Sequence, residues 1–194
     1  MEISIDLIKK LREKTGISIA ECKKALIEKG GDEGKALEFL RKKGEEVMAA
    51  KAERTTKSGI IGFYLHADLK QAALVKLLCE TDFVARNEEF KTLAHDLAMQ
   101  IVALNPQWVS PSDVPESIIK KEKEIYLREL DKKKPKTIKE KIIDGKLAKF
   151  YRVNCLLKQS FIKQEDLTIE QLMADYVNKL GEKIEVKEFV RLKI

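Results

Sequence analysis

The first 44 residues repeat one pattern, in which apolar residues recur at helical spacing and a glycine follows. Three polar residues stand where helix N-caps are expected: Ser4, Ser18 and Asp32. Three glycines follow the apolar stripes, and each is predicted to close a helix: Gly16, Gly30 and Gly44. The pattern therefore predicts a compact three-helix domain over residues 1–44.

Residues 45–57 keep a helix-forming composition without a convincing apolar stripe, so we expect a helical or extended connector there. After Gly59 the apolar period changes to two, which is typical of strands. Residues 60–65 and 72–80 form two such runs around a turn and predict an antiparallel hairpin. The closing stretch, KIEVKEFVRLKI, alternates in the same way and predicts a third strand.

Four further helices are indicated by apolar residues at helical spacing. They cover residues 88–104, about 115–131, about 136–157 and 169–180. Thr168 is placed to cap the last of them, and Gly181 to end it. The order of helices, hairpin, helices and strand fits an α+β core over residues 58–194, with a small antiparallel sheet, better than parallel βαβ units.

The residue types and their spacing argue against catalysis. The two histidines, His66 and His95, have no cysteine or carboxylate at ligand or triad spacing. The glycine-rich motifs that hold phosphates, G-x-x-x-x-G-K-[ST] and G-x-G-x-x-G, are absent from the sequence. The three cysteines are far apart and odd in number, so we expect reduced, mostly buried thiols. We predict that the protein is not an enzyme, holds no metal or cofactor, and binds no nucleotide directly.

Charge and hydropathy narrow the setting. No apolar run approaches the roughly 18 residues that cross a bilayer, and the charged N-terminus does not resemble a secretory signal, so we expect a cytoplasmic protein without membrane contact. The net charge is +6, but basic and acidic residues are interleaved along most of the chain. One basic run stands out, between Lys132 and Lys141. An alternative function is therefore a helical protein that binds the ribosome or RNA through this region, with a steep salt dependence.

The stretch CETDFVARNEEF, residues 79–90, places a phenylalanine, Phe83, among polar and charged residues. In one interpretation, Phe83 begins the apolar stripe of the helix that contains Phe90, and Asp82 or Asn87 caps that helix. In the other, a corner between strand and helix presents Phe83 outward as an aromatic anchor for a partner. The pattern does not choose between them.

Several stretches resemble the elongation factor Ts family. They are LIKKLREKTGISIAECKKALIEKGGDEGKALEFLRKKG, CETDFVARNEEFKTLAHDLAMQI, NPQWVSPSDVP, EKIIDGKLAKFY and LGEKIEV, which together extend over essentially the whole chain. The resemblance implies a nucleotide exchange factor that binds the GTPase elongation factor Tu in its GDP state, displaces Mg²⁺ and lets GDP leave. It also implies a UBA-like N-terminal domain, although similarity to ubiquitin-associated domains does not by itself indicate a ubiquitin-binding adaptor.

The resemblance also implies which residues meet the partner. In the family, a T-D-F-V stretch approaches the Mg²⁺ and nucleotide site of the GTPase, and its aromatic ring inserts between helices. The matching residues here are Thr81, Asp82, Phe83 and Val84. A second contact, made by the N-terminal domain, corresponds to Leu11, Arg12, Ile17, Ser18, Ile19 and Ala20. Many relatives carry methionines where this chain has Ile19 and Ala20, and these side chains repack less freely than methionine.

Two expectations concern a residue and a surface. Asp82 is either a helix cap or a charge that acts on the Mg²⁺ of the partner or on its water ligands. The strand at residues 60–65 is apolar on both faces, and helices on a single side of the sheet would leave one of these faces wet. We therefore expect a homodimer formed sheet on sheet through the core domain.

Overall fold

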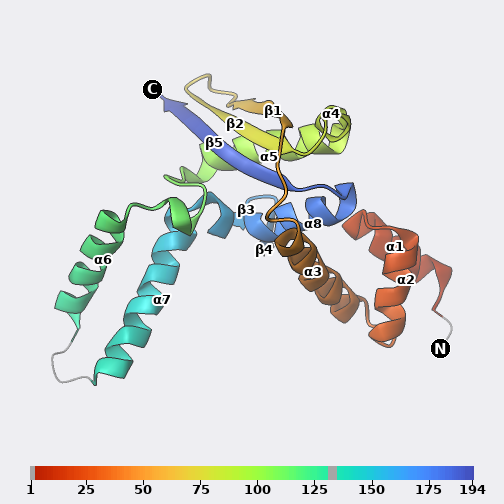
Figure 1. The fold of residues 1–194 in the computed structure, drawn as a ribbon, viewed down its shortest axis with the longest axis horizontal. Helices are drawn as coiled ribbons and strands as arrows, with labels where there is room; N and C mark the ends of the chain where they lie inside the picture. Colours follow the sequence, from red (N-terminus) through yellow and green to blue (C-terminus); the bar gives the residue numbers. More distant parts are fainter. Residues whose placement is uncertain (1–2, 131–134) are drawn as a thin grey trace. The chain divides into compact units, whose positions relative to one another are not determined.

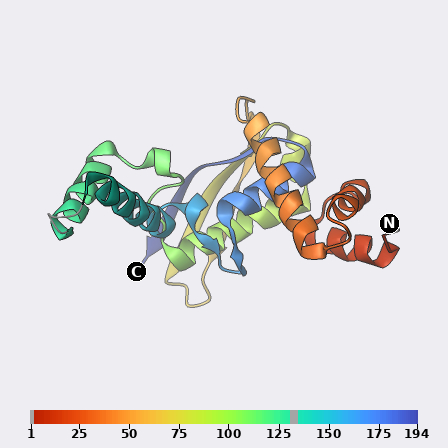
Figure 2. The ribbon, with the colours of Figure 1, turned by 90° about the horizontal axis from the view of Figure 1, so that it is seen from below.

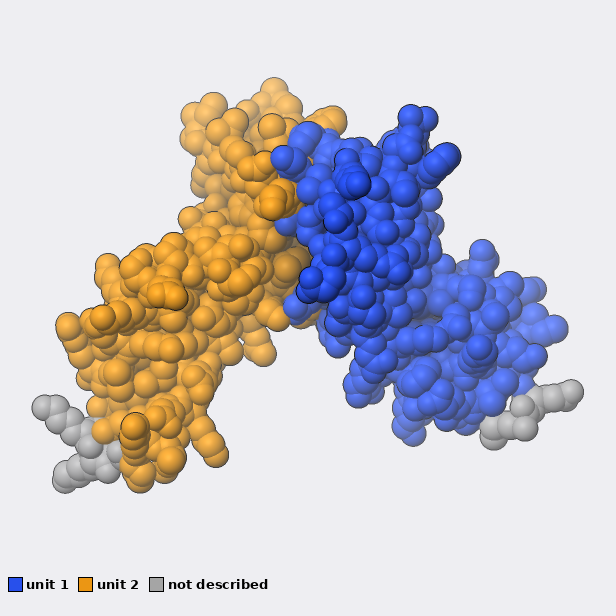
Figure 3. All heavy atoms as spheres, in the orientation of Figure 1, with its two compact units in different colours: residues 1–61, 76–94, 170–186 blue, residues 62–75, 95–169, 187–194 orange. Residues whose placement is uncertain are grey.

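The computed structural model describes residues 3–130 and 135–194. The chain forms two compact units, which are coloured separately in Figure 3. The first unit consists of Met1–Ile61, Lys76–Ala94 and Glu170–Val186, and the second of Gly62–Val75, His95–Ile169 and Lys187–Ile194. Each unit thus combines segments that are distant in the sequence. The division of the chain into residues 1–44, 45–57 and 58–194 stays a prediction.

Three helices make up the N-terminal part of the first unit (Figure 1): α1 (Ile5–Thr15), α2 (Ile19–Glu28) and α3 (Glu33–Ala50). The three predicted caps are confirmed, since each side chain accepts a hydrogen bond from the N–H three residues on: Ser4 and Ser18 at 3.3 Å, and Asp32 at 3.0 Å. Gly16 ends α1 in the left-handed conformation, with φ 66°. The helices enclose a core of eight buried residues: Ile8, Leu11, Ile17, Cys22, Ala25, Leu26, Ala36 and Leu40.

The helix end predicted at Gly44 is wrong. α3 continues to Ala50, and Gly44 lies buried in its interior. A Cβ atom at this position would come within 3.3 Å of the carbonyl oxygen of Ala174 in α8 (Ile169–Leu180). Glycine is therefore used here to let two helices approach closely, and residues 45–50 of the predicted connector are helical.

A three-stranded sheet has the strand order β1-β2-β5 (Figure 1). Its strands are β1 (Ser58–Leu65), β2 (Gln71–Cys79) and β5 (Ile184–Lys193). The turn between β1 and β2 is closed by a hydrogen bond from the His66 N–H to the Gln71 carbonyl at 2.9 Å. The predicted hairpin and the predicted terminal strand are both confirmed.

The long helix α5 (Glu88–Leu104) has the bounds that its pattern predicts, and its apolar stripe is buried except at the last residue, Leu104, which is 45% exposed. In the second unit, Tyr64 packs edge-on against His95 of α5, with 5.6 Å between the ring centroids, and Arg191 donates to the carbonyl of Val102 at 3.2 Å. These contacts turn one face of the sheet toward α5. Within the second unit, the opposite face exposes five large apolar side chains: Phe63, Leu65, Leu74, Val190 and Leu192.

The second unit also contains a helical hairpin. Its helices α6 (Glu116–Glu129) and α7 (Lys136–Asn154) lie side by side in both ribbon views (Figures 1 and 2). Lys146 pairs with Glu129, and its ammonium lies 5.1 Å from the centre of the Tyr126 ring. The basic run is divided: Lys132, Lys133 and Lys134 lie outside the described residues, whereas Lys136, Lys139 and Lys141 lie on α7.

The remaining elements are short, and the sequence pattern did not predict them. They are α4 (Asp82–Arg86), the 3₁₀ turns Pro111–Asp113 and Leu156–Lys158, and an antiparallel ribbon of β3 (Ser160–Phe161) and β4 (Gln164–Thr168). The buried side chain of Gln100 in α5 holds the ribbon, because it donates to the Ser160 carbonyl and accepts from the Ile162 N–H, both at 3.0 Å.

Candidate partner-binding site

Strand β2 and helix α5 are joined by a corner, residues 80–87, that is built around α4. The hydroxyl of Thr81 caps α4, since it accepts a hydrogen bond from the Val84 N–H at 3.5 Å. Asn87 ends α4, and its side-chain oxygen accepts from the Glu89 N–H at 2.8 Å, where α5 begins. The corner is therefore one turn of helix between two polar caps.

Phe83 is the second residue of α4, and it is 82% exposed. It does not belong to the buried stripe of α5, so the interpretation that it begins that stripe is wrong. Asp82 is not the cap either, because Thr81 fills that position. The carboxylate of Asp82 instead pairs with Arg86 at 3.0 Å. Ala85, on the same turn, is buried. The helix thus turns its small apolar residue inward and its aromatic ring outward.

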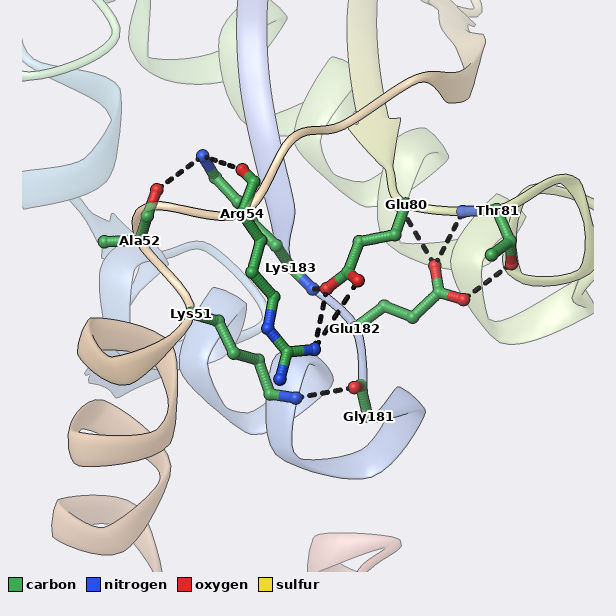
Figure 4. A network of polar contacts seen from close by, with 8 residues as sticks. All are labelled: Lys51, Ala52, Arg54, Glu80, Thr81, Gly181, Glu182 and Lys183. Carbon is green, nitrogen blue, oxygen red and sulfur yellow. Dashed lines mark hydrogen bonds and ion pairs between the residues drawn. The ribbon is translucent and has the colours of Figure 1, made fainter.

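Two carboxylates hold the beginning of the corner (Figure 4). The side chain of Glu182 accepts hydrogen bonds from the N–H groups of Glu80 and Thr81, both at 3.0 Å. In return, the side chain of Glu80 accepts from the N–H of Lys183 at 2.6 Å. Neither Glu80 nor Glu182 could be identified from the sequence, because the bonded residues lie 101 to 103 positions apart and neither glutamate stands out in a chain rich in acidic residues.

The thiol of Cys79, just before the corner, is a structural group. It is buried and donates to the carbonyl of Thr81 at 3.1 Å. Burial, and then the nearby carboxylate of Glu182, raise the pKa of Cys79 to about 11, so the thiol stays protonated near neutral pH and is a poor nucleophile. Cys22 and Cys155 are also free and buried, which confirms the expectation of unpaired thiols.

The N-terminal residues that the resemblance singled out fall into two groups. Leu11 and Ile17 lie in the core of α1, α2 and α3, with 0% and 5% of their surface exposed, so their side chains are not available to a partner. The other four are exposed and flank the turn between α1 and α2: Arg12, Ser18, Ile19 and Ala20. Among these, Ile19 offers the largest apolar side chain, 57% exposed. We refer to these four residues as the N-terminal surface.

The corner and the N-terminal surface belong to the same unit. Within residues 3–130 and 135–194, no three His, Cys, Asp or Glu side chains are grouped to hold a metal ion, and no helix is long and apolar enough to cross a bilayer. The two histidines make local contacts: His66 bonds to the Tyr64 hydroxyl at 3.2 Å, and His95 to the Phe63 carbonyl at 3.1 Å. An exposed ring beside exposed charges is instead suited to protein recognition.

One protein family matches the chain along almost its whole length: its model, described as "Elongation factor TS", matches residues 2–194. The chain is 50% identical over 194 residues to elongation factor Ts of Thermodesulfovibrio yellowstonii, with 100% of this chain and 97% of the relative covered. Identity to elongation factor Ts of Fervidobacterium nodosum is 49% over 195 residues, covering 100% and 99%. For elongation factor Ts of Thermotoga petrophila it is 50% over 194 residues, covering 100% and 97%.

Proposed function

The chain belongs to the elongation factor Ts family, and we propose that it binds elongation factor Tu in its GDP state, displaces the bound Mg²⁺ and promotes the release of GDP. Membership of the family makes it a translation elongation factor. The observation that most directly supports the finer proposal is the 82% exposure of Phe83 on a short helix with a capped start. In this role the protein makes or breaks no bond, uses no cofactor and works in the cytoplasm.

Binding is divided between two surfaces of the first unit. The N-terminal surface, with Ile19 as its apolar centre, docks the factor on the GTPase and orients it. The corner, with Thr81, Asp82 and Val84 around Phe83, approaches the Mg²⁺ and nucleotide site. The buried positions of Leu11 and Ile17 limit their contribution to shaping the N-terminal surface from beneath.

The energetic requirement is a difference in binding between two states of the partner. If the factor weakens GDP binding about 10³-fold, it must supply about 4 kcal/mol of coupling free energy, at about 1.4 kcal/mol for each tenfold change. A buried aromatic anchor contributes about 2 to 4 kcal/mol. Phe83 therefore supplies most of the coupling if its ring is better accommodated by the nucleotide-free partner, because an equal fit to both states shifts nothing.

Asp82 contributes charge in this proposal. Because Thr81 caps α4, the carboxylate of Asp82 is not needed for that task, and it is exposed next to Phe83. A ring that enters the partner brings this carboxylate toward the bound Mg²⁺ or its water ligands. Its attraction for the ion competes with the coordination that the GTPase and the nucleotide provide.

The decisive experiment measures GDP release. Elongation factor Tu is loaded with a fluorescent GDP analogue and mixed with excess unlabelled GDP and increasing amounts of this protein. We expect the release rate to rise with factor concentration and to reach a plateau. A rate that stays at the spontaneous value at every concentration overturns the proposal. Binding to RNA that weakens steeply with salt, in the absence of any such acceleration, would favour the alternative through the Lys132–Lys141 region.

We propose further that a second copy of the chain covers the exposed face of the sheet. The five apolar side chains on that face come from all three strands, and α5 covers the other face, so one face of the sheet lacks cover among the described residues. Two copies related by a twofold axis present the same apolar patch to each other, which makes the contact self-complementary.

Light scattering tests the dimer. At micromolar concentration we expect twice the mass of one chain, and Leu192→Lys, which places a charge at a residue 66% exposed on the patch, should give the single-chain mass. Leu127→Lys is the matched control, because Leu127 is an exposed leucine on α6, away from the sheet. A wild-type protein with the mass of one chain contradicts the proposal.

A further inference from the structure

The loop after α8 makes an unusually dense set of polar contacts with the corner that carries Phe83 (Figure 4). One oxygen of the Glu182 carboxylate accepts from the N–H groups of Glu80 and Thr81, both at 3.0 Å. The other oxygen accepts from the hydroxyl of Thr81 at 2.5 Å. A single side chain therefore binds three donors of the first two residues of the corner.

These contacts bear directly on the cap of α4. The Thr81 hydroxyl donates its hydrogen bond to Glu182, so a lone pair of the same oxygen is turned toward the Val84 N–H. α4 has only five residues, and a helix of one turn has little stability of its own. The direction of Phe83, two residues beyond the cap, consequently depends on how firmly Thr81 is held.

The loop is itself fixed on its other side by the segment that follows α3. The ammonium of Lys51 donates to the Gly181 carbonyl at 2.7 Å, and the ammonium of Lys183 donates to the carbonyls of Ala52 and Arg54 at 2.7 and 2.9 Å. All of these residues, like the corner, belong to the first unit. Glu182 is therefore attached to a fixed part of that unit and can transmit its position to the corner.

Glu80 completes the arrangement in the opposite direction. Its carboxylate accepts from the Lys183 N–H at 2.6 Å and from Arg54 at 3.3 Å. The hydrogen bond from the Lys183 backbone, followed by that from Arg54, lowers the pKa of Glu80, so the side chain is ionised at neutral pH. Reciprocal bonds between a strand end and a loop define one relative arrangement more strictly than a single bond would.

We propose that Glu182 is a positioning residue for nucleotide exchange: it fixes Thr81, and through the cap of α4 it sets the direction in which Phe83 is presented. This role rests on the proposed exchange function, because only in that setting does the direction of the ring affect a rate. Glu182 does not meet the partner in this account, and its effect passes through the corner.

The test begins with the free protein. Amide hydrogen exchange of Thr81 and Val84 is compared in the wild type, Glu182→Gln and Glu182→Ala. Alanine removes all three acceptor contacts, so we expect both amides to exchange at least about 10-fold faster. Glutamine keeps the shape and one acceptor oxygen, so we expect an intermediate value. Glu185→Gln is the control, because it changes a nearby glutamate that accepts from the Thr56 hydroxyl at 2.6 Å and pairs with the Lys183 ammonium at 3.3 Å, and glutamine keeps an acceptor oxygen there.

The second measurement is the rate of GDP release from elongation factor Tu. If Glu182→Ala leaves the corner correctly arranged about one-tenth of the time, the plateau rate falls about 10-fold. The factor concentration at half-maximal rate should change much less, since the N-terminal surface is intact. Glu182→Gln should recover part of the loss, and Glu185→Gln should retain the wild-type plateau. A variant that is slow because it has lost its fold is recognised by a lowered thermal unfolding midpoint, which is measured for each protein.

A double substitution separates positioning from other effects. In the Phe83→Ala background the ring is already absent, so adding Glu182→Ala should slow GDP release less than twofold further. Losses that multiply, or a Glu182→Ala protein with the wild-type plateau and amide exchange, overturn the proposal. If the wild-type protein does not accelerate GDP release, the proposed function fails, and amide exchange alone then decides whether Glu182 holds the corner.

Discussion

Replacing Phe83 with alanine separates the folding of the protein from its proposed action. The ring is 82% exposed, so it contributes little to the core of the free chain. Exposed substitutions away from caps and special backbone positions usually change the free energy of unfolding by less than about 0.5 kcal/mol. We therefore expect Phe83→Ala to unfold at the wild-type denaturant midpoint. Any change in the rate of GDP release then reflects a lost contact with the partner.

The size of the effect on exchange follows from the exposed area of the ring. A phenylalanine buries roughly 200 Å² on full burial, so 82% exposure leaves about 160 Å² for the partner to cover. At about 25 cal/mol per Å², this is worth about 4 kcal/mol, and alanine keeps about a quarter of it. The remaining loss of about 3 kcal/mol corresponds to a decrease of about 100-fold if all of it favours the nucleotide-free state.

Stopped-flow release of a fluorescent GDP analogue from elongation factor Tu measures this decrease directly. We expect the plateau rate of Phe83→Ala to fall about 10- to 100-fold, the lower value applying if part of the contact is also made with the GDP state. Binding to nucleotide-free partner should persist through the N-terminal surface. Ile5→Ala, which truncates another exposed apolar residue of the same unit, is the control and should behave as wild type. A Phe83→Ala protein with an unchanged plateau refutes the reasoning.

Five other substitutions test separate parts of the structure. Asp82→Asn should slow GDP release several-fold, most strongly at low Mg²⁺, without changing the unfolding midpoint, whereas Arg86→Gln, which keeps the Asp82 charge, should not slow it. Gly145→Ala should stabilise the protein by about 0.5 to 1 kcal/mol in urea unfolding, because nothing lies within 4 Å of the new Cβ on α7. Gly44→Leu should lower the free energy of unfolding by about 1 to 3 kcal/mol, because the new side chain would collide with the backbone of Ala174. Burial raises the pKa of Asp175 to about 6, so its ionisation lowers the stability of the folded protein as pH rises from about 4 to 6. Asparagine does not ionise. The free energy of unfolding of Asp175→Asn, relative to wild type, should therefore be about 1 to 3 kcal/mol higher at pH 8 than at pH 4.

The long elements were predictable because one face of each is buried over many residues. α5 is the clearest case, since its apolar positions recur over seventeen residues and both predicted ends match Glu88–Leu104. The hairpin and β5 were readable from a period of two, although β5 buries only Ile184 and exposes Val190 and Leu192. Gly44 shows the limit of this reasoning, because a glycine suits both a helix end and a close helix contact. Only the position of Ala174, far along the chain, decides between them.

The corner could be located in the sequence but not described from it. A helix of five residues is too short to show a period, so the outward direction of Phe83 had no local signal. The contacts of Glu182 were also unreadable, because they join residues about a hundred positions apart. Resemblance to a family supplied candidate contacts but not their burial. For that reason it included Leu11 and Ile17, which lie in the core of the N-terminal helices.

Holding an aromatic ring in water requires that the chain around it cannot fold the ring back. The corner meets this requirement with polar contacts at both ends, Glu182 on Thr81 at the start and Asn87 on Glu89 at the finish, while Ala85 anchors the middle. The ordering cost of the corner is then met during folding, which leaves more of the ring's burial energy for the partner. Two classes of variant should result. Loss of the ring should slow GDP release while the amides of the corner keep their normal protection from hydrogen exchange. Loss of an end contact should slow GDP release and also weaken that amide protection.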